Sequence, residues 1–484
     1  MMADLACFPL LCAFAIALVS LLSIKIERGQ RLLHILGAVI YLLVSIYVFR
    51  TVQLDGRLVL RIGGYPSGFA ISFLLDGFSS LMLLVTAVTV FATAMYSLVD
   101  TTIHKISIFY PAFWFMLCGV TGAFSTGDLF NLYVWFEVMI MASFVLMTLS
   151  HEEKVLQGTL YYIGLNILAT LLMLLAISFL YGLSGTLDMY DMAGWFHDSQ
   201  NSAVALPFIA LLLVSLAIKS ALFPYYFWLP DSYYLTSVTV GAIFAGLLTK
   251  VGIYTLMRTA TLFFSPSAHF MEILLFVSCF TMLGGVFGAM TDFHIRRILS
   301  FHIVSQVGYM TLALAMSTTL ALSAGIFYIV HHIIVKTNLF LIAGLISRYN
   351  GHVNLRKMGN FLGKKPLLAI LFLIPALSLA GMPPFSGFWA KFLVLKSALA
   401  GGFWMSAVIA LAVGFFTLYS MIKIWRYAFL QPAQFKTRNI PLQERMFFYL
   451  PIIFLGLITL FIGFFPETLY AVANAAAQAL LQQE

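Results

Sequence analysis

Long apolar runs separated by short polar stretches recur from one end of this chain to the other. An apolar run of about 18 residues or more is long enough to cross the roughly 30 Å hydrocarbon core of a membrane. Such runs must be helical, because backbone groups in lipid have to pair within their own segment. The pattern predicts an all-α polytopic membrane protein with about fourteen transmembrane spans, at 4–24, 32–49, 71–98, 107–125, 128–149, 156–181, 203–229, 235–259, 269–290, 297–316, 321–346, 367–396, 403–427 and 446–471.

Composition and motifs support a membrane protein and narrow its chemistry. Hydrophobic residues make up 62% of the chain and charged residues 9%, whereas soluble domains average about 25% charged. The first run, Leu5 to Ile24, has no basic residue ahead of it and no evident cleavage site, so we expect an uncleaved helix. The four cysteines lack metal-ligand spacing, and nucleotide- and metal-binding motifs are absent from the sequence. No cofactor or metal ion is expected.

The basic residues of the predicted loops fall mainly on one side. The other side carries only Arg50, Arg57, Arg61 and Arg258, together with the acidic 183–202 loop that holds Asp188, Asp191 and Asp198. By the positive-inside rule the basic side is cytoplasmic and both termini face out. The net charge of +8 therefore indicates orientation rather than nucleic-acid binding. The basic side holds Lys25, Arg28, Arg31, Lys105, Lys154, Arg296, Arg297, Arg348, Arg356, Lys357, Lys364, Lys365, Arg426, Lys436, Arg438 and Arg445.

Ionisable side chains inside the spans are the main candidates for function. A charge at mid-span costs roughly 2.5–3.5 kcal/mol, so four unpaired charged lysines would cost on the order of 10 kcal/mol. Each lysine must either pair with Glu137 or lose its proton, and both remedies create a group that exchanges protons reversibly. The alternative is that these residues only fix helix packing. The candidates are Glu137, Lys219, Lys250, His302, His331, His332, Lys336 and Lys391.

For some ionisable residues within the spans, a simpler role competes with proton exchange. His331 and His332 are adjacent, about 100° apart around a helix, so we expect only one of them to line a path. Lys423 and Lys396 lie nearer to span ends, where a long side chain can reach the interface.

Two spans are expected to break. Pro224 follows Lys219 in the seventh span, and Pro383 and Pro384 precede Lys391 in the twelfth. Proline removes a backbone donor and clashes with the preceding turn. Paired interrupted helices are typical of transport sites built at the interface of inverted repeats.

The spacing of the lysines suggests such a repeat. Lys219 and Lys250 are 31 residues apart, and Lys391 and Lys423 are 32 apart. The broken spans are five spans apart, and an odd offset reverses direction across the membrane. We therefore predict two inverted five-helix units, spans 4–8 and 9–13. The corresponding segments are an N-terminal 1–106, half-channels at 107–260 and 261–430, and a C-terminal helix within 431–484.

The same segments resemble the proton-pumping antiporter-like family shared by respiratory complex I and the Mrp cation/proton antiporters. The resemblance rests on YFWLPDSYYLTSVTVGAIFAGLLTKVGIYTLMR at 226–258, HIVSQVGYM at 302–310 and ALSLAGMPPFSGFWAKFLVL at 376–395. The HxxxVK form ending at Lys336 and the lysine at 391 look most like the D-type member of the Mrp antiporters. One departure is Leu235-Thr236-Ser237, where family members often carry prolines.

The resemblance implies one component of a multisubunit secondary transporter in a bacterial inner membrane. The resemblance also implies partner subunits and the exchange of sodium for protons. Neither of these follows from this chain's own residues. The resemblance also implies that Glu137 and Lys219 are the paired acid and base of one half-channel. Lys250 and the histidines would form a relay, and Lys391 the exit group. One alternative is the same proton module in a redox-driven complex, and another is an inert scaffold. The exchanged cation, the stoichiometry and the direction of each half-channel are not given by the sequence.

Overall fold

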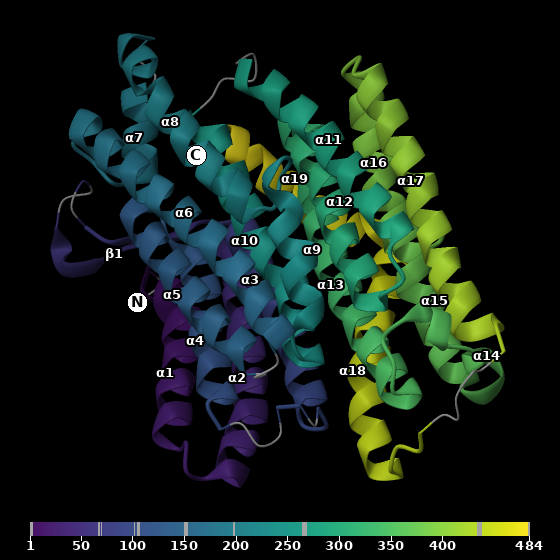
Figure 1. Ribbon diagram of the computed structural model, residues 1–484. Helices are drawn as coiled ribbons and strands as arrows, with labels where there is room; N and C mark the ends of the chain where they lie inside the picture. Colours follow the sequence, from purple (N-terminus) through teal and green to yellow (C-terminus); the bar gives the residue numbers. More distant parts are fainter. Residues whose placement is uncertain are drawn as a thin grey trace.

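The computed structural model describes residues 3–482, except 66, 67, 69, 101, 104–106, 150–152, 197, 198, 264–268 and 433–437. Three residues used above for orientation, Lys105, Asp198 and Lys436, lie outside the described residues. The described part is almost wholly helical, and its long helices pack side by side (Figure 1). This confirms the all-α membrane fold predicted from the apolar runs.

The N-terminal segment forms three long helices and a small hairpin, in which Leu58 pairs with Leu75 and Arg61 with Ser72. The apolar runs do not predict this hairpin. The predicted span at 71–98 takes in its second strand, whereas the helix begins only after Asp76, whose carboxylate accepts a 2.8 Å hydrogen bond from the backbone N–H of Ser79. The elements are η1 (Ala3–Cys7), α1 (Phe8–Leu22), α2 (Glu27–Asp55), β1 (Leu58–Arg61), η2 (Ile62–Gly64), β2 (Ser72–Leu75) and α3 (Gly77–Ser97).

Two helical units follow. The first comprises α4 (Phe109–Ser125), α5 (Leu129–Thr148), α6 (Glu153–Ser184), α7 (Met189–Phe196), α8 (Ser199–Lys219), η3 (Tyr225–Phe227), α9 (Trp228–Ser232), η4 (Tyr233–Leu235) and α10 (Val238–Phe263). The second comprises α11 (His269–Thr291), α12 (Ile295–Ala315), α13 (Thr319–Asn350), η5 (Leu355–Lys357), α14 (Phe361–Lys364), α15 (Pro366–Ala380), α16 (Ser386–Ala400), α17 (Trp404–Trp425) and η6 (Arg426–Leu430).

The helices account for the fourteen predicted spans. Within the described ranges, 11 helices are long and apolar enough to cross a membrane by length and composition. Three shorter apolar helices, Phe109–Ser125, Ala203–Lys219 and Pro366–Ala380, stand where the other three spans were predicted. The last two of these are the spans that carry the predicted breaks.

The C-terminal segment contains two helices, where the sequence pattern predicts one. Helix α18 (Leu442–Phe464) ends before Pro466, which begins α19 (Pro466–Gln482). The predicted span 446–471 runs across this junction and is wrong at its end, because a proline fits the first turn of a new helix better than the interior of an old one. Helix α19 packs against α13 and α3 and buries Leu469, Ala473, Ala477 and Leu480.

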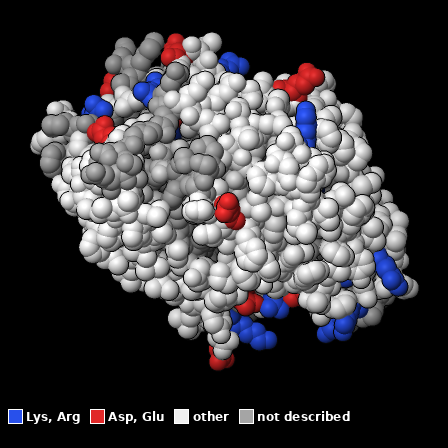
Figure 2. Space-filling view, turned by 90° about the horizontal axis from the view of Figure 1, so that it is seen from above, with Lys and Arg blue, Asp and Glu red and all other residues white. Residues whose placement is uncertain are grey.

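Helices α10 and α13 form the centre of the molecule. Every residue of α10 from Thr239 to Phe263 is buried, and so is nearly all of α13. Helix α13 contacts α3, α10, α12, α15, α16, α18 and α19. The peripheral helices instead expose large apolar side chains, as membrane-facing or partner-facing helices do. Seen from above, the surface is mostly uncharged, with charged side chains scattered mainly near its edges (Figure 2).

Arg258 is not the loop residue that the orientation argument assumed. It lies within α10 with 2% of its surface exposed, and its Nη2 lies 2.8 Å from Oδ2 of Asp76. Its Nε also donates to the hydroxyl of Tyr254 at 3.1 Å. Both members of this buried ion pair are hydrogen-bonded, and the pair joins α10 to the start of α3. Because the arginine is not in a loop, it gives no information about the orientation of the chain in the membrane.

The two units are copies in which several corresponding elements lie 166 residues apart, although the broken helices depart from this offset. A Cβ on Gly119 of α4 would meet the backbone of Met139, and one on Gly285 of α11 would meet the backbone of Ser305. The bridge Asp128–Asp188 likewise recurs as His294–Asn354. Helix α6 and helix α13 begin and end 166 residues apart.

The copies are inverted. Helix α11 begins near the upper edge in Figure 1 and runs downward, whereas α4 runs upward from the lower part of the molecule. The repeat predicted from the broken spans is therefore present in the fold.

The close approach of α11 and α12 gives a first prediction. In Gly285→Ala the new methyl would press on the backbone of Ser305, which cannot move aside as a side chain can. We expect a loss of about 1–3 kcal/mol in stability, seen as a lower thermal-unfolding midpoint of the purified protein. The matched control is Gly164→Ala on α6, where a Cβ has open space. Equal midpoints for the two variants would contradict the close packing described here.

Candidate functional site

The first helix break lies directly after Lys219, the last residue of α8. Ala221 adopts a positive φ of 56°, and Pro224 follows before the short helices η3 and α9. Trp228 Nε1 donates to the carbonyl of Ile218 at 3.1 Å, and so pairs one of the carbonyls at the end of α8. The break predicted at Pro224 is confirmed.

The second break separates α15 from α16. Helix α15 ends at Ala380, Gly381 has a φ of 91°, and Pro383 and Pro384 precede the new helix. Here it is Lys391 that reaches back across the break, because its Nζ donates to the carbonyl of Ala380 at 3.0 Å. The break predicted at the two prolines is also confirmed.

The two lysines do not occupy equivalent places. Lys219 precedes its break, whereas Lys391 follows its own by more than one helical turn. The nearly equal spacings of 31 and 32 residues to the next lysine therefore do not reflect the structural repeat. The inverted units are present, but the lysines do not stand at matching positions within them.

Lys219 is buried beside α5. Its Nζ lies 4.7 Å from the centre of the Phe136 ring and has no hydrogen-bond partner among the described residues. Half-buried Glu137, next to Phe136, is near enough to interact with it electrostatically. No direct ion pair joins the two side chains in the described structure. Glu137 thus influences this lysine across a short gap.

Lys250 and Lys336 lie at the centre, on α10 and α13. Both are fully buried. Lys250 Nζ donates to the carbonyl of Ala245 at 2.5 Å, and Lys336 Nζ donates to the carbonyl of Leu299 at 3.0 Å. The two lysines interact electrostatically with each other, and Lys336 also interacts with Lys391.

His332 and His331 interact with different sets of neighbours. His332 interacts with Lys250 and Lys336, and within the described chain neither of its ring nitrogens has a hydrogen-bond partner. His331 interacts with Lys391 and Lys336, and its Nδ1 lies 2.8 Å from the hydroxyl of Ser386 at the start of α16. Both imidazoles are therefore close to buried lysines, so the expectation that only one lines a path stays untested.

His302 on α12 completes the set. Its Nε2 lies 2.5 Å from the hydroxyl of Ser420 on α17, and it interacts electrostatically with Lys336, Lys391 and Lys423. We call Lys219, Lys250, His332, Lys336, His302, His331 and Lys391 the charge line. Electrostatic interactions connect its members from Lys250 to Lys391, whereas Lys219 interacts with Glu137.

Hydroxyl and amide side chains that were not among the predicted candidates surround the charge line. Ser378 and Ser386 lie 3.0 Å apart beside His331, and Tyr328 hydrogen-bonds Gln306. Several of these groups, such as Asn338, have buried polar atoms with no described partner, which suits water-mediated contacts. The only signal in the sequence is that they are polar residues within apolar spans.

Lys391 also faces a cavity of about 220 Å³ between α16 and α17. The cavity is lined mostly by apolar residues, among them Phe388, Leu411 and Phe415. Lys391 is the ionisable member of this lining.

Lys423 differs from the lysines of the charge line in the number of hydrogen bonds that its ammonium group donates. A lysine ammonium carries three N–H donors. Lys423 Nζ donates to the carbonyls of Ala289, Met290 and Asp292, at 3.2, 2.7 and 2.7 Å. All three donors are satisfied at the C-terminal end of α11, where the helix dipole favours a cation. Lys423 is therefore a structural cap, whereas each lysine of the charge line has at most one such partner among the described residues.

The four cysteines are free, and no group of three or more His, Cys, Asp or Glu side chains that could hold a metal ion is found in the described ranges. What the site can do is pass a proton between neighbouring buried nitrogen atoms, because each can hold a proton or release it.

Fold and site together define a polytopic membrane protein of two inverted helical units with a buried line of ionisable groups. The profile of the family described as "NADH:quinone oxidoreductase/Mrp antiporter, TM" matches residues 126–417. The chain is 39% identical to the D component of the Na(+)/H(+) antiporter of Alkalihalophilus pseudofirmus, over 99% of this chain and 98% of that one. The chain belongs to this family.

Solved structures agree. A chain in the structure of the Mrp complex from Dietzia sp. DQ12-45-1b has 31% sequence identity and a TM-score of 0.89, with 100% of this chain and 97% of that chain covered. A chain of respiratory complex I from Thermus thermophilus has a TM-score of 0.82 at 24% identity, covering 99% of this chain and 100% of that chain. At that identity the second likeness shows the fold alone.

The capping role of Lys423 can be tested by substitution. In Lys423→Met three carbonyls lose a charged donor, and hydrogen bonds of that kind contribute about 1.5–3 kcal/mol. We expect a lower thermal-unfolding midpoint, restored largely by Lys423→Arg, which keeps several donors. Lys396→Met is the control, because Lys396 is exposed on α16. If Lys423→Met and Lys396→Met unfold at the same temperature, Lys423 is no cap.

Proposed function

We propose that this chain is the proton-translocating component of a multisubunit cation/proton antiporter. The observation that carries the proposal is the charge line itself: buried lysines with at most one hydrogen-bond partner in the described structure, held beside histidines. An arrangement of this kind is costly for folding and suited to proton exchange. Membership of the antiporter family supports the same function.

The proposed route follows the electrostatic neighbours. A proton enters one half-channel and reaches Lys219 or Lys250. It passes by way of His332, Lys336 and His302 or His331 to Lys391, and leaves on the opposite face. Water bridges the gaps between groups that do not touch, and the surrounding hydroxyl groups orient that water.

Glu137 would control entry. Because it acts on Lys219 through space, a movement of α5 against α8 changes how firmly the lysine holds its proton. A lysine that holds its proton more firmly repels protons on the next lysine in a low-dielectric interior. This is how occupancy at one end of the charge line would be felt further along it.

The remaining parts of the proposal concern the assembly. Two half-channels, 107–260 and 261–430, follow the N-terminal segment 1–106, and the two helices of 431–484 pack against the second half. Partner membrane subunits complete the antiporter, and the exchanged cation is sodium, as in the name of the Alkalihalophilus relative. The membrane is the bacterial plasma membrane, with the basic loops in the cytoplasm and both termini outside.

A redox-driven complex is the alternative use of the same module. The likeness to complex I is one of fold, and the charge line would work equally well there. Purifying the native complex separates the two, because iron–sulfur proteins would accompany this chain only in a redox-driven assembly.

The role of Lys219 is tested by Lys219→Ala in the assembled complex. We expect sodium-dependent proton movement in everted membrane vesicles to fall by about 10²-fold or more, the scale on which a positioned proton-transfer group contributes. Lys396→Ala is the matched control, because it removes an exposed lysine of the same charge. Normal antiport by Lys219→Ala would exclude the proposed entry group.

Release of the proton, rather than charge alone, is tested by Lys391→Arg. Arginine keeps the positive charge but does not give up its proton in proteins. We therefore expect the complex to assemble, as judged by co-purification of its components, while antiport is lost. Antiport at the unsubstituted rate would mean that Lys391 acts only as a fixed charge.

A further inference from the structure

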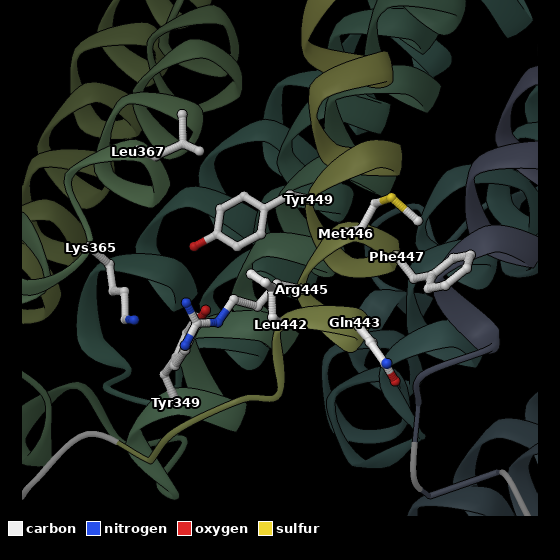
Figure 3. A pocket seen from close by; sticks show the side chains of 9 residues that line it. All are labelled: Tyr349, Lys365, Leu367, Leu442, Gln443, Arg445, Met446, Phe447 and Tyr449. Carbon is white, nitrogen blue, oxygen red and sulfur yellow. The ribbon is translucent and has the colours of Figure 1, made fainter.

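A large surface pocket lies between the starts of α15 and α18, away from the charge line. It has a volume of about 910 Å³, and its lining includes Tyr349, Lys365, Arg445 and Tyr449 (Figure 3). Figure 3 shows the side chains of Lys365 and Arg445 directed into the same space, with Tyr349 below them and Tyr449 above. The proposed function makes no use of this pocket.

The charge of the pocket is one-sided. Lys365 and Arg445 line it, and no carboxylate is among its lining residues in the described structure. Burial and the neighbouring Arg445 both lower the pKa of Lys365. The Lys365 ammonium lies 4.8 Å from the centre of the Tyr349 ring, and Arg445 Nε donates to the carbonyl of Ile440 at 2.9 Å. Two cations held near each other, in a lining that contains no carboxylate among the described residues, form a site for an anion. Glu444, beside Arg445 in the first turn of α18, lies outside this lining.

The position of the pocket at the starts of two helices indicates what kind of anion it would bind. Lys365 immediately precedes α15, and Arg445 lies in the first turn of α18, so both cations stand where these two helices enter the membrane. The lower edge in Figure 1, where α18 begins, also carries α14 and the turn between α1 and α2. Residues further along α15 and α18 lie deeper in the membrane than the two cations. Within the pocket, the hydroxyl of Tyr449 interacts with that of Tyr349.

An apolar surface continues from the cations into the membrane. Leu367, Leu442 and Met446 line the pocket and are 51%, 79% and 56% exposed. Leu457 and Phe461 extend the exposed apolar face along α18. Cations at the interface, with apolar side chains leading away from them along the helices, match a molecule with an anionic head and hydrocarbon tails.

We propose that this pocket binds an anionic phospholipid, with its phosphate on Lys365 and Arg445 and its acyl chains along α15 and α18. The guanidinium pairs with phosphate oxygens through parallel N–H bonds, and the lysine adds a second charge. The bound lipid would join the end of α13, which carries Tyr349, to the starts of α15 and α18. It would thereby stabilise the half of the molecule that carries Lys391.

The test uses the purified complex in detergent, titrated with phosphatidylglycerol while thermal unfolding is followed. We expect the lipid to raise the unfolding midpoint, and Lys365→Gln combined with Arg445→Gln to raise the lipid concentration needed by about tenfold or more. The matched control is Lys357→Gln combined with Lys364→Gln, which removes two exposed charges outside the pocket and should leave the titration unchanged.

Further arms identify the source of the phosphate. Phosphatidylcholine and inorganic phosphate should each produce no comparable shift, and a photo-crosslinker placed at Leu442 in native membranes should label phospholipid. An unchanged phosphatidylglycerol titration in the Lys365/Arg445 variant would overturn the proposal. So would an equal shift with inorganic phosphate alone, or crosslinking of Leu442 to another protein in place of lipid.

Discussion

The structure depends on how a lysine ammonium is accommodated in a helical interior that offers almost no carboxylate. Lys250, Lys336 and Lys391 donate to the backbone carbonyls of Ala245, Leu299 and Ala380, and not to acidic side chains. A carbonyl stabilises the ammonium without the full negative charge of a carboxylate, so it holds the lysine's proton less firmly than an ion pair would. Where three carbonyls converge the lysine becomes a fixed cap, as Lys423 does.

Helix breaks supply such carbonyls, and the two breaks use them differently. At the first break an indole N–H takes the carbonyl of Ile218, which leaves Lys219 without a described partner and under the influence of Glu137. At the second break Lys391 itself takes the carbonyl of Ala380. The fold is symmetric in its helices and asymmetric in its chemistry, which is what a path needs if it is to have an entry group unlike its exit group.

Sequence reasoning reached the fourteen spans, both breaks and the buried candidates because each follows from a local rule: span length, missing donors at proline, and the cost of a charge in lipid. It missed features that depend on contacts between distant segments. The hydroxyl of Ser420 beside His302, the partnership of Arg258 with Asp76 and the three carbonyls around Lys423 have no local signal. The lysine spacing misled for the same reason, since equal separations along the chain did not mean equivalent places in the fold.

One consequence of the 166-residue offset is that corresponding positions of α6 and α13 can be compared directly. The positions of His332 and Lys336 in α13 correspond to Asn166 and Thr170 in α6, and both of these bond to the backbone of their own helix. Helix α6 exposes many apolar side chains, whereas α13 is enclosed on all sides. Corresponding helices of the two units thus carry neutral residues at the rim and titratable ones at the centre. The location of each helix in the assembled molecule accompanies this difference in side-chain chemistry.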